Sequence, residues 1–257
     1  MTKRPGGGRM RTGAAVFTDF DGTVTTVDSL QRILTVFTGE AWRRIEDEVE
    51  AGRIGDRRSL QMEFDLVRAS RVEAMAVVDR DVAVDPAFPP FAAWLKRRGV
   101  PLTVLSGGFA SIIRRVLGRH GLETLEVRAN EARVSRGRWR VVPARGRRLC
   151  GACNHCKTAS IVRARRAGLQ TIFVGNGVTD RCPARHADLV FAKGVLAAHC
   201  RRERIPFRRY RTFRDVRRAL ERECVLPAAA PERRAGRSSA SSRRSGPRSS
   251  SASGGRA

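Results

Sequence analysis

Two aspartates separated by one residue, Asp19 and Asp21, follow the apolar segment Val16–Thr18. Aromatic and β-branched residues favour a buried strand here, and Gly22 permits an abrupt turn after it. Carboxylates at the carboxyl end of a strand are how open α/β sheets build ligand sites. The pair suits metal-assisted phosphoryl transfer, with Asp19 as the nucleophile and Asp21 as the group that gives and takes the proton. The alternative is a solvated Asp-Gly turn.

Three further segments place reactive or flexible residues at the ends of expected elements. Ser106 and Gly107 follow the apolar run Val100–Leu105, where a strand is expected to turn into a helix. The hydroxyl and a backbone N–H could bind phosphate oxygens there, or Ser106 could simply cap the helix. Lys157 begins a helical pattern, and the loop 176–180 follows another apolar run. These positions are typical of a doubly wound parallel sheet with a ligand site at its edge.

Taken together, the segments resemble the four motifs of the haloacid dehalogenase-like phosphatase superfamily: an Asp-x-Asp pair, a Ser or Thr, a Lys and a late acidic, Gly-rich loop. Thr25–Ser29, Ser106–Phe109 and Gly177–Asp180 resemble most the branch that holds phosphoserine phosphatase and the enol-phosphate phosphatase of methionine salvage. The resemblance covers most of the folded chain. It implies a Rossmann-like α/β core with a small helical cap inserted after the first strand, and hydrolysis of a small phosphorylated metabolite through an aspartyl-phosphate.

The chemistry of a phosphomonoester dianion calls for positive charge around its oxygens, and Mg²⁺ with hard oxygen ligands would supply it. The expected ligands are the Asp19 carboxylate, the backbone carbonyl of Asp21 and the late loop with Asn176 and Asp180. The family usually has Asp where this chain has Asn176. An amide keeps an oxygen but removes a charge, and losing about 1.4 kcal/mol of attraction weakens binding tenfold. We therefore expect weakened metal affinity, with Asp180 holding metal-bound water or orienting Lys157.

The rarity of lysine singles out Lys157, one of four lysines in a chain that otherwise uses arginine. A compact ammonium would neutralise Asp19 and a phosphate oxygen. The alternative is a solvated lysine in the first turn of a helix, which the helix dipole disfavours. Arg57, in the expected cap, is a candidate substrate contact by the same resemblance, and an exposed arginine on a solvated face is its alternative. The substrate stays open among amino-acid, sugar and enol phosphates, and an acceptor hydroxyl would make the enzyme a phosphotransferase.

Three cysteines at tight spacing, Cys150, Cys153 and Cys156, precede the candidate lysine. They could bind zinc, but a structural zinc site needs a fourth ligand besides three cysteines. His155 and Cys182 are the candidates for it. A local disulfide or inert thiols are the other interpretations. The composition predicts a cytoplasmic protein without a signal peptide or a membrane-spanning segment, and therefore mostly reduced cysteines.

The formal net charge of +26 would ordinarily suggest a nucleic-acid partner. Residues 1–13 contribute +4 and residues 227–257 contribute +6, which leaves +16 in the body. No reading motif or aromatic stacking platform accompanies this charge, so we expect no nucleic-acid function. The rival function is a catalytically weak homologue that binds a phosphate ligand or a polyanion. The sequence gives no oligomeric state.

The pattern of apolar residues divides the chain into four parts. Residues 1–13 and 227–257 lack apolar periodicity and are expected to be disordered. Apolar residues at helical spacing predict a helical cap over 30–90. The core domain then comprises 14–29 and 91–226, with further strands expected at 125–130, 138–142, 171–174 and 188–192, and helices at 91–98, 109–117 and 157–167.

Overall fold

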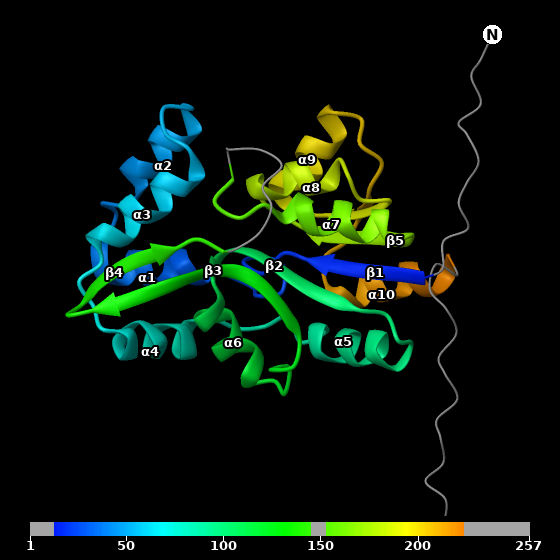
Figure 1. Cartoon of the computed structure of the whole chain (residues 1–257), viewed down its shortest axis with the longest axis horizontal. Coiled ribbons are helices and arrows are strands. Elements are labelled where there is room, and N and C mark those ends of the chain that lie inside the picture. Colours follow the sequence, from blue (N-terminus) through cyan, green and yellow to red (C-terminus); the bar gives the residue numbers. More distant parts are fainter. Residues whose placement is uncertain (1–12, 145–152, 224–257) are drawn as a thin grey trace, which may run out of the picture.

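The computed structural model describes residues 13–144 and 153–223. A twisted sheet runs through this part of the chain in the order β4-β3-β2-β1-β5-β6-β7 (Figure 1). Neighbouring strands are parallel except for the antiparallel β3–β4 hairpin. The strands are β1 (Gly13–Thr18), β2 (Leu102–Phe109), β3 (Glu126–Ser135), β4 (Arg138–Val142), β5 (Leu169–Gly175), β6 (Leu189–Ala192) and β7 (Arg208–Arg209). The expected doubly wound α/β fold is confirmed.

Helices cover both faces of this sheet, with α7, α8 and α9 on one side and α4, α5 and α6 on the other (Figure 1). The helices are α1 (Ser29–Thr38), α2 (Arg43–Glu50), α3 (Asp56–Leu66), α4 (Arg71–Asp81), α5 (Phe88–Arg97), α6 (Ala110–Gly118), α7 (Lys157–Arg166), the 3₁₀ turn η1 (Val178–Asp180), α8 (Arg181–Ala184), α9 (Gly194–Arg202) and α10 (Phe213–Arg222). Within the described ranges, no helix is long and apolar enough to cross a membrane.

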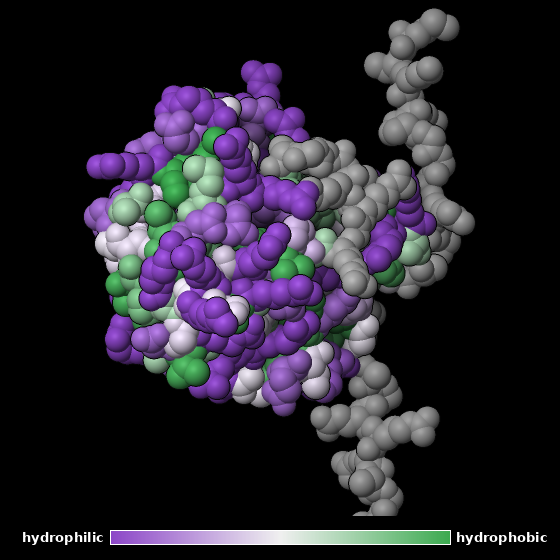
Figure 2. All heavy atoms as spheres, turned by 60° about the vertical axis from the view of Figure 1, so that its left-hand side comes forward, coloured by the Kyte–Doolittle hydropathy of each residue, from purple (hydrophilic) through white to green (hydrophobic). Residues whose placement is uncertain are grey.

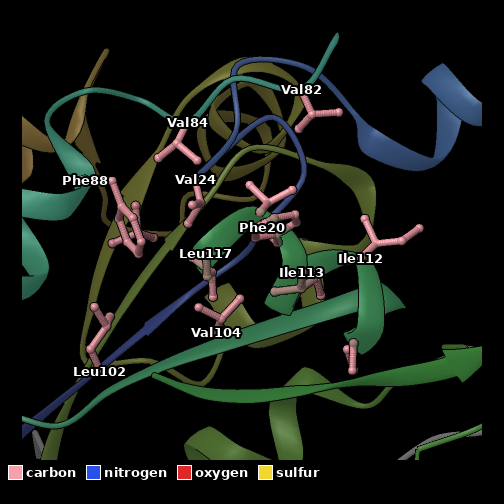
Figure 3. Packing of buried hydrophobic residues seen from close by; sticks show 14 of the residues in the cluster. Phe20, Val24, Val82, Val84, Phe88, Leu102, Val104, Ile112, Ile113 and Leu117 are labelled. Atoms are coloured by element: carbon pink, nitrogen blue, oxygen red, sulfur yellow. The ribbon is translucent and has the colours of Figure 1, made fainter. Parts of the chain in front are cut away.

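Two apolar clusters fill the space between the helices and the sheet. Alternate residues of β1 point to opposite faces, so Val16 belongs to one cluster and Phe17 to the other. The larger cluster joins β1 and β2 to α5, α6 and the inserted helices, and Figure 3 shows Phe20 and Val104 within it. Because both faces are covered, the central strands are apolar along their length, which is why they could be recognised as apolar runs.

The inserted segment leaves and returns to the core at one place. Thr25 pairs with Val84 in an isolated antiparallel bridge, and the N–H of Thr26 donates to the Ala83 carbonyl at 2.9 Å. Helices α1 to α4 lie between these points, and α2 is an element that apolar periodicity had not indicated. The boundaries 30–90 for a cap domain stay a prediction. The strand β1 begins at Gly13, one residue inside the expected disordered end, and the basic ends otherwise lie outside the described residues.

Candidate active site

The turn after β1 places the first carboxylate. The backbone N–H of Asp19 donates to the Val174 carbonyl of β5 at 2.9 Å, so the residue remains in register with its neighbour as the strand ends. Phe20 is fully buried and anchors the turn in the core (Figure 3). Gly22 then has φ of +68°, a conformation that favours glycine. The carboxylate is thereby fixed at the carboxyl edge of the sheet.

One buried lysine joins two aspartates that are far apart in the sequence. Lys157, the first residue of α7, places its Nζ 2.5 Å from Asp19 Oδ1 and 2.7 Å from Asp180 Oδ1. The Thr179 hydroxyl lies 3.2 Å from the same ammonium. The Lys157 side chain is only 2% exposed. The solvated alternative for Lys157 is therefore wrong, because Lys157 is buried in ion pairs with Asp19 and Asp180.

The titration of this cluster reflects an excess of buried negative charge. Burial and the Asp180 carboxylate raise the pKa of Asp19, while the Lys157 ammonium opposes that rise. Burial favours the neutral amine of Lys157, but Asp180 and Asp19 outweigh it, so the pKa of the lysine rises. The Oδ2 atom of Asp19 makes no hydrogen bond to any residue that the structure describes. An additional cation beside this carboxylate would balance the site.

The second carboxylate of the pair is held at the start of α1. Asp21 Oδ1 accepts hydrogen bonds from the Ser29 N–H at 2.8 Å and from the Ser29 hydroxyl at 2.6 Å. Asp28 caps the same helix, since its side chain accepts from the N–H groups of Leu30 and Gln31. Burial and the neighbouring Asp28 raise the pKa of Asp21 to about 7. A carboxyl group with that pKa can exist in either protonation state near neutral pH.

The late loop is organised by Asp180 and Asn176. Asp180 Oδ2 accepts from the N–H groups of Asn176 at 2.9 Å and Gly177 at 3.0 Å, so both oxygens of this carboxylate bond to protein donors. The Asn176 Oδ1 accepts from the Thr23 hydroxyl at 2.9 Å. A Cβ on Gly22 would lie only 2.4 Å from Asn176 Nδ2. This geometry favours the orienting role for Asp180, and it brings Asn176 against the turn that carries the two acids.

The expected phosphate cradle lies inside an extended strand. A register shift between Leu105 and Phe109 lets β2 continue through Ser106, so α6 begins only at Ala110. Ser106 is therefore not a helix cap, which corrects that interpretation. Its Oγ accepts the Gly108 N–H at 2.9 Å, which leaves the hydroxyl proton available to a ligand.

The same strand segment also approaches the second acid. A Cβ on Gly108 would lie 3.4 Å from Asp21 Oδ2. A Cβ on Gly107 would lie 2.6 Å from the Asn154 side chain. The glycines thus permit close packing around the Ser106 hydroxyl and keep it near Asp21.

The structure therefore brings Asp19, Lys157, Asp180 and Asn176 together, with Asp21 and Ser106 beside them. Arg57 is not part of this cluster: it is exposed and lines a separate cavity between α3 and the β3–β4 hairpin. Further positioning groups were not singled out from the sequence, namely Thr23, Ser29 and Thr179. Ser29 and Thr179 stand inside two segments that carried the resemblance, Thr25–Ser29 and Gly177–Asp180, which was the available signal.

The donors around Asp19 fit Mg²⁺ better than zinc. Among the described residues no group of three His, Cys, Asp or Glu side chains could hold a metal ion. What the site offers is the carboxylate of Asp19 with the neutral oxygens of Asn176 and the Asp21 backbone. Mg²⁺ needs few protein oxygens because it retains several waters, whereas zinc sites are built mainly from Cys sulfur and His nitrogen. Cys150 lies outside the described residues, so the expected metal or disulfide role of that cluster stays a prediction.

Comparison with known proteins finds a matching family and relatives over most of the chain. The model of the haloacid dehalogenase-like hydrolase family matches residues 16–185. The chain is 31% identical over 222 residues to Pdp3-interacting factor 1 of Schizosaccharomyces pombe, covering 80% of this chain and 94% of that protein. It is 29% identical over 215 residues to the 2-hydroxy-3-keto-5-methylthiopentenyl-1-phosphate phosphatase of Geobacillus kaustophilus, covering 82% and 97% of the two chains.

A solved structure supports the same fold. The phospho-aspartyl intermediate analogue of phosphoserine phosphatase matches with a TM-score of 0.61 and 19% identity, over 80% of this chain and 98% of that one. The resemblance read from the four motifs is thereby confirmed. The chain belongs to the haloacid dehalogenase-like hydrolase family.

Proposed function

We propose that this protein is a Mg²⁺-dependent phosphomonoesterase that hydrolyses a small phosphorylated metabolite through an aspartyl-phosphate on Asp19. One observation carries the proposal: Lys157 is buried between Asp19 and Asp180 at the carboxyl edge of the sheet, while Oδ2 of Asp19 has no hydrogen-bond partner in residues 13–144 and 153–223. The relative from Geobacillus kaustophilus, which matches 82% of this chain, is named as a 2-hydroxy-3-keto-5-methylthiopentenyl-1-phosphate phosphatase. A buried ion pair adds little to stability, and titratable groups perturbed by burial and a charge partner cluster at functional sites.

The first half of the reaction forms a bond between Asp19 Oδ2 and phosphorus. Lys157 holds the other oxygen of the nucleophile, so Oδ2 is the atom that faces the substrate. The leaving oxygen departs with the electron pair of its bond to phosphorus and takes the proton of Asp21. The pKa of about 7 allows Asp21 to carry that proton near neutral pH. Mg²⁺, when bound, would neutralise phosphoryl charge and favour the ionised form of Asp19.

The second half returns the enzyme to its starting state. Asp21, now ionised, takes a proton from a water molecule, which attacks phosphorus as the bond to Asp19 Oδ2 breaks. Inorganic phosphate leaves, and Asp21 is again protonated. The Ser106 hydroxyl and the N–H of Gly107 are the proposed donors to the phosphoryl oxygens, and Lys157 neutralises one of them. Asn176 and Asp180 stay the proposed late-loop contributors to the metal site, with Asp180 acting through Lys157 and the loop backbone.

The test is phosphate release from a panel of amino-acid, sugar and enol phosphates, with and without Mg²⁺. We expect release that requires Mg²⁺ and is lost in Asp19→Asn, while Asp47→Asn, at an exposed position of α2, stays active. In Asp21→Asn release should fall by about 10²–10⁴-fold, the usual contribution of a general acid. No release from any compound would favour the rival function, a phosphate- or polyanion-binding homologue. The cytoplasmic location and the lack of a nucleic-acid role stay predictions.

A further inference from the structure

Two arginines face each other across the β3–β4 hairpin. Arg133 and Arg140 are direct partners in the antiparallel register, so their Cβ atoms are about 4.5–5.5 Å apart. Residues on the opposite face of the hairpin, Ala132 and Trp139, are buried. The two guanidinium groups therefore share the face that is not packed into the core. Like charges directly opposite each other destabilise a sheet, so this pair needs a compensating interaction.

A third guanidinium comes from the inserted segment. Helix α3 lies along the edge of β4, where Gln61 Nε2 donates to the Trp139 carbonyl at 3.2 Å and Oε1 accepts the Val141 N–H at 2.8 Å. Arg57 stands one turn before Gln61 on this helix. A cavity of about 470 Å³ separates α3 from the hairpin and is lined by Arg57, Gln61, Arg133, Arg140, Val141, Val142 and Pro143. Hydrophilic side chains dominate this side of the molecule (Figure 2).

No carboxylate of the described residues neutralises these three arginines. None of the ion pairs within the described ranges includes Arg57, Arg133 or Arg140. The acidic residue that precedes Arg133 on the same face of β3, Glu131, pairs with Arg114 of α6 at 3.3 Å. The cavity is thus a concentration of positive charge with hydrogen-bond donors to spare.

The position of α3 connects this cavity with the catalytic cluster. Asp56, the first residue of α3 and the neighbour of Arg57, interacts electrostatically with Lys157. The hairpin is tied to the phosphate cradle as well, because Asn130 of β3 donates to the Gly107 carbonyl at 2.7 Å. The elements that carry the three arginines therefore border the proposed active site.

We propose that the cavity between α3 and the hairpin binds a phosphate or carboxylate group through Arg57, Arg133 and Arg140. The planar guanidinium fork matches both oxyanions with paired hydrogen bonds. The group can belong to the substrate, as a second anionic group besides the scissile phosphoryl, or to a separate small anion. Only the first source rests on the proposed phosphatase function.

The binding test uses inorganic phosphate and calorimetry on the full chain. If the catalytic site also binds phosphate, the wild type shows two sites and Arg133→Gln/Arg140→Gln shows one. If the proposed function is wrong, the wild type shows one site and the double variant none. In either case the double variant should bind phosphate at the cavity at least about tenfold more weakly than the wild type, or not at all. Arg138→Gln, on the same strand but outside the cavity, is the matched control and should bind like the wild type.

Equal phosphate binding by the wild type and the double variant would overturn the proposal. Both arginines are exposed and repel each other, so the double variant should melt at the same or a higher temperature than the wild type in anion-free buffer. An unchanged or higher melting temperature would show that lost binding is not caused by misfolding. Paired substrates then identify the source. A raised KM only for phosphomonoesters with a second anionic group assigns the site to the substrate, and an unchanged KM with lost phosphate binding assigns it to a separate anion.

Discussion

Replacing Lys157 by methionine removes the one ammonium that, among the described residues, contacts Asp19 and Asp180, and leaves two buried carboxylates facing each other. Methionine fills similar volume, so the main change is electrostatic. Removing one partner of a buried ion pair costs about 3–5 kcal/mol, because the remaining charge has neither water nor a counter-ion. For a chain of this size each kcal/mol lowers the melting temperature by about 2–4 °C, so we expect a fall of roughly 6–20 °C.

The pH dependence of that loss has a defined sign. Burial and Asp180 raise the pKa of Asp19, and Lys157 is the group that opposes them. Without the lysine, folded Asp19 binds its proton more readily than unfolded Asp19 does. A raised carboxyl pKa makes the folded state more stable as the pH falls. The difference in melting temperature between Lys157→Met and the wild type should therefore be smaller at pH 5.5 than at pH 8.

The assay is thermal and chemical unfolding of a double-mutant cycle. Lys157→Met/Asp180→Asn leaves one carboxylate in place of two, so the two changes should be less than additive by about 1–3 kcal/mol. Lys96→Met, at an exposed position of α5, is the control and should change stability by less than about 0.5 kcal/mol. A Lys157→Met protein that melts within about 2 °C of the wild type would refute the reasoning, because it would show that the two carboxylates do not depend on the ammonium.

Three further predictions concern the late loop, the turn after β1 and a buried histidine. Asn176→Asp adds a carboxylate beside Asp19, so it should lower the melting temperature without Mg²⁺ and tighten Mg²⁺ binding about tenfold in calorimetry; unchanged affinity would contradict it. Gly22 has φ of +68°, and an added Cβ would lie 2.4 Å from Asn176 Nδ2. Gly22→Ala should therefore lower the free energy of unfolding in urea by more than about 1 kcal/mol. A change under about 0.5 kcal/mol would show that the turn does not require glycine. Burial and Arg181 lower the pKa of His199, so the wild type should lose stability as the pH falls below about 6.5. The free energy of unfolding of His199→Asn should change less between pH 8 and 5.5. Parallel pH profiles of the two proteins would show that His199 does not cause the loss of stability.

The parts of the fold that could be predicted are those with covered, apolar strands. The run expected at 171–174 is the centre of β5 (Leu169–Gly175), and the run expected at 188–192 contains β6 (Leu189–Ala192). Buried parallel strands are apolar on both faces, so they stand out from polar surroundings. The four motifs were identified by their resemblance to a known family. The motifs at strand ends meet because the carboxyl ends of parallel strands share one edge of the sheet.

Elements with little apolar content could not be predicted. Helix α2 buries only Ile45, and its other residues except Val49 are charged, while β7 consists of two exposed arginines. The local role of Ser106 was also hidden, because a register shift that prolongs β2 depends on pairing with β3 rather than on local residues. The sequence could not show that Asp180 gives one oxygen to Lys157 and the other to the loop backbone, since that depends on side-chain packing.

In the proposed reaction the phosphoryl group moves from the substrate to Asp19. Trapping this aspartyl-phosphate is the most direct test. The wild type is mixed with a phosphomonoester that it turns over, quenched in acid within one turnover, digested and analysed by mass spectrometry. The account predicts one phosphoryl group on the peptide that contains Asp19, and none in Asp19→Asn. Turnover with a phosphoryl group on another residue, or with none on any peptide across quench times, would contradict it.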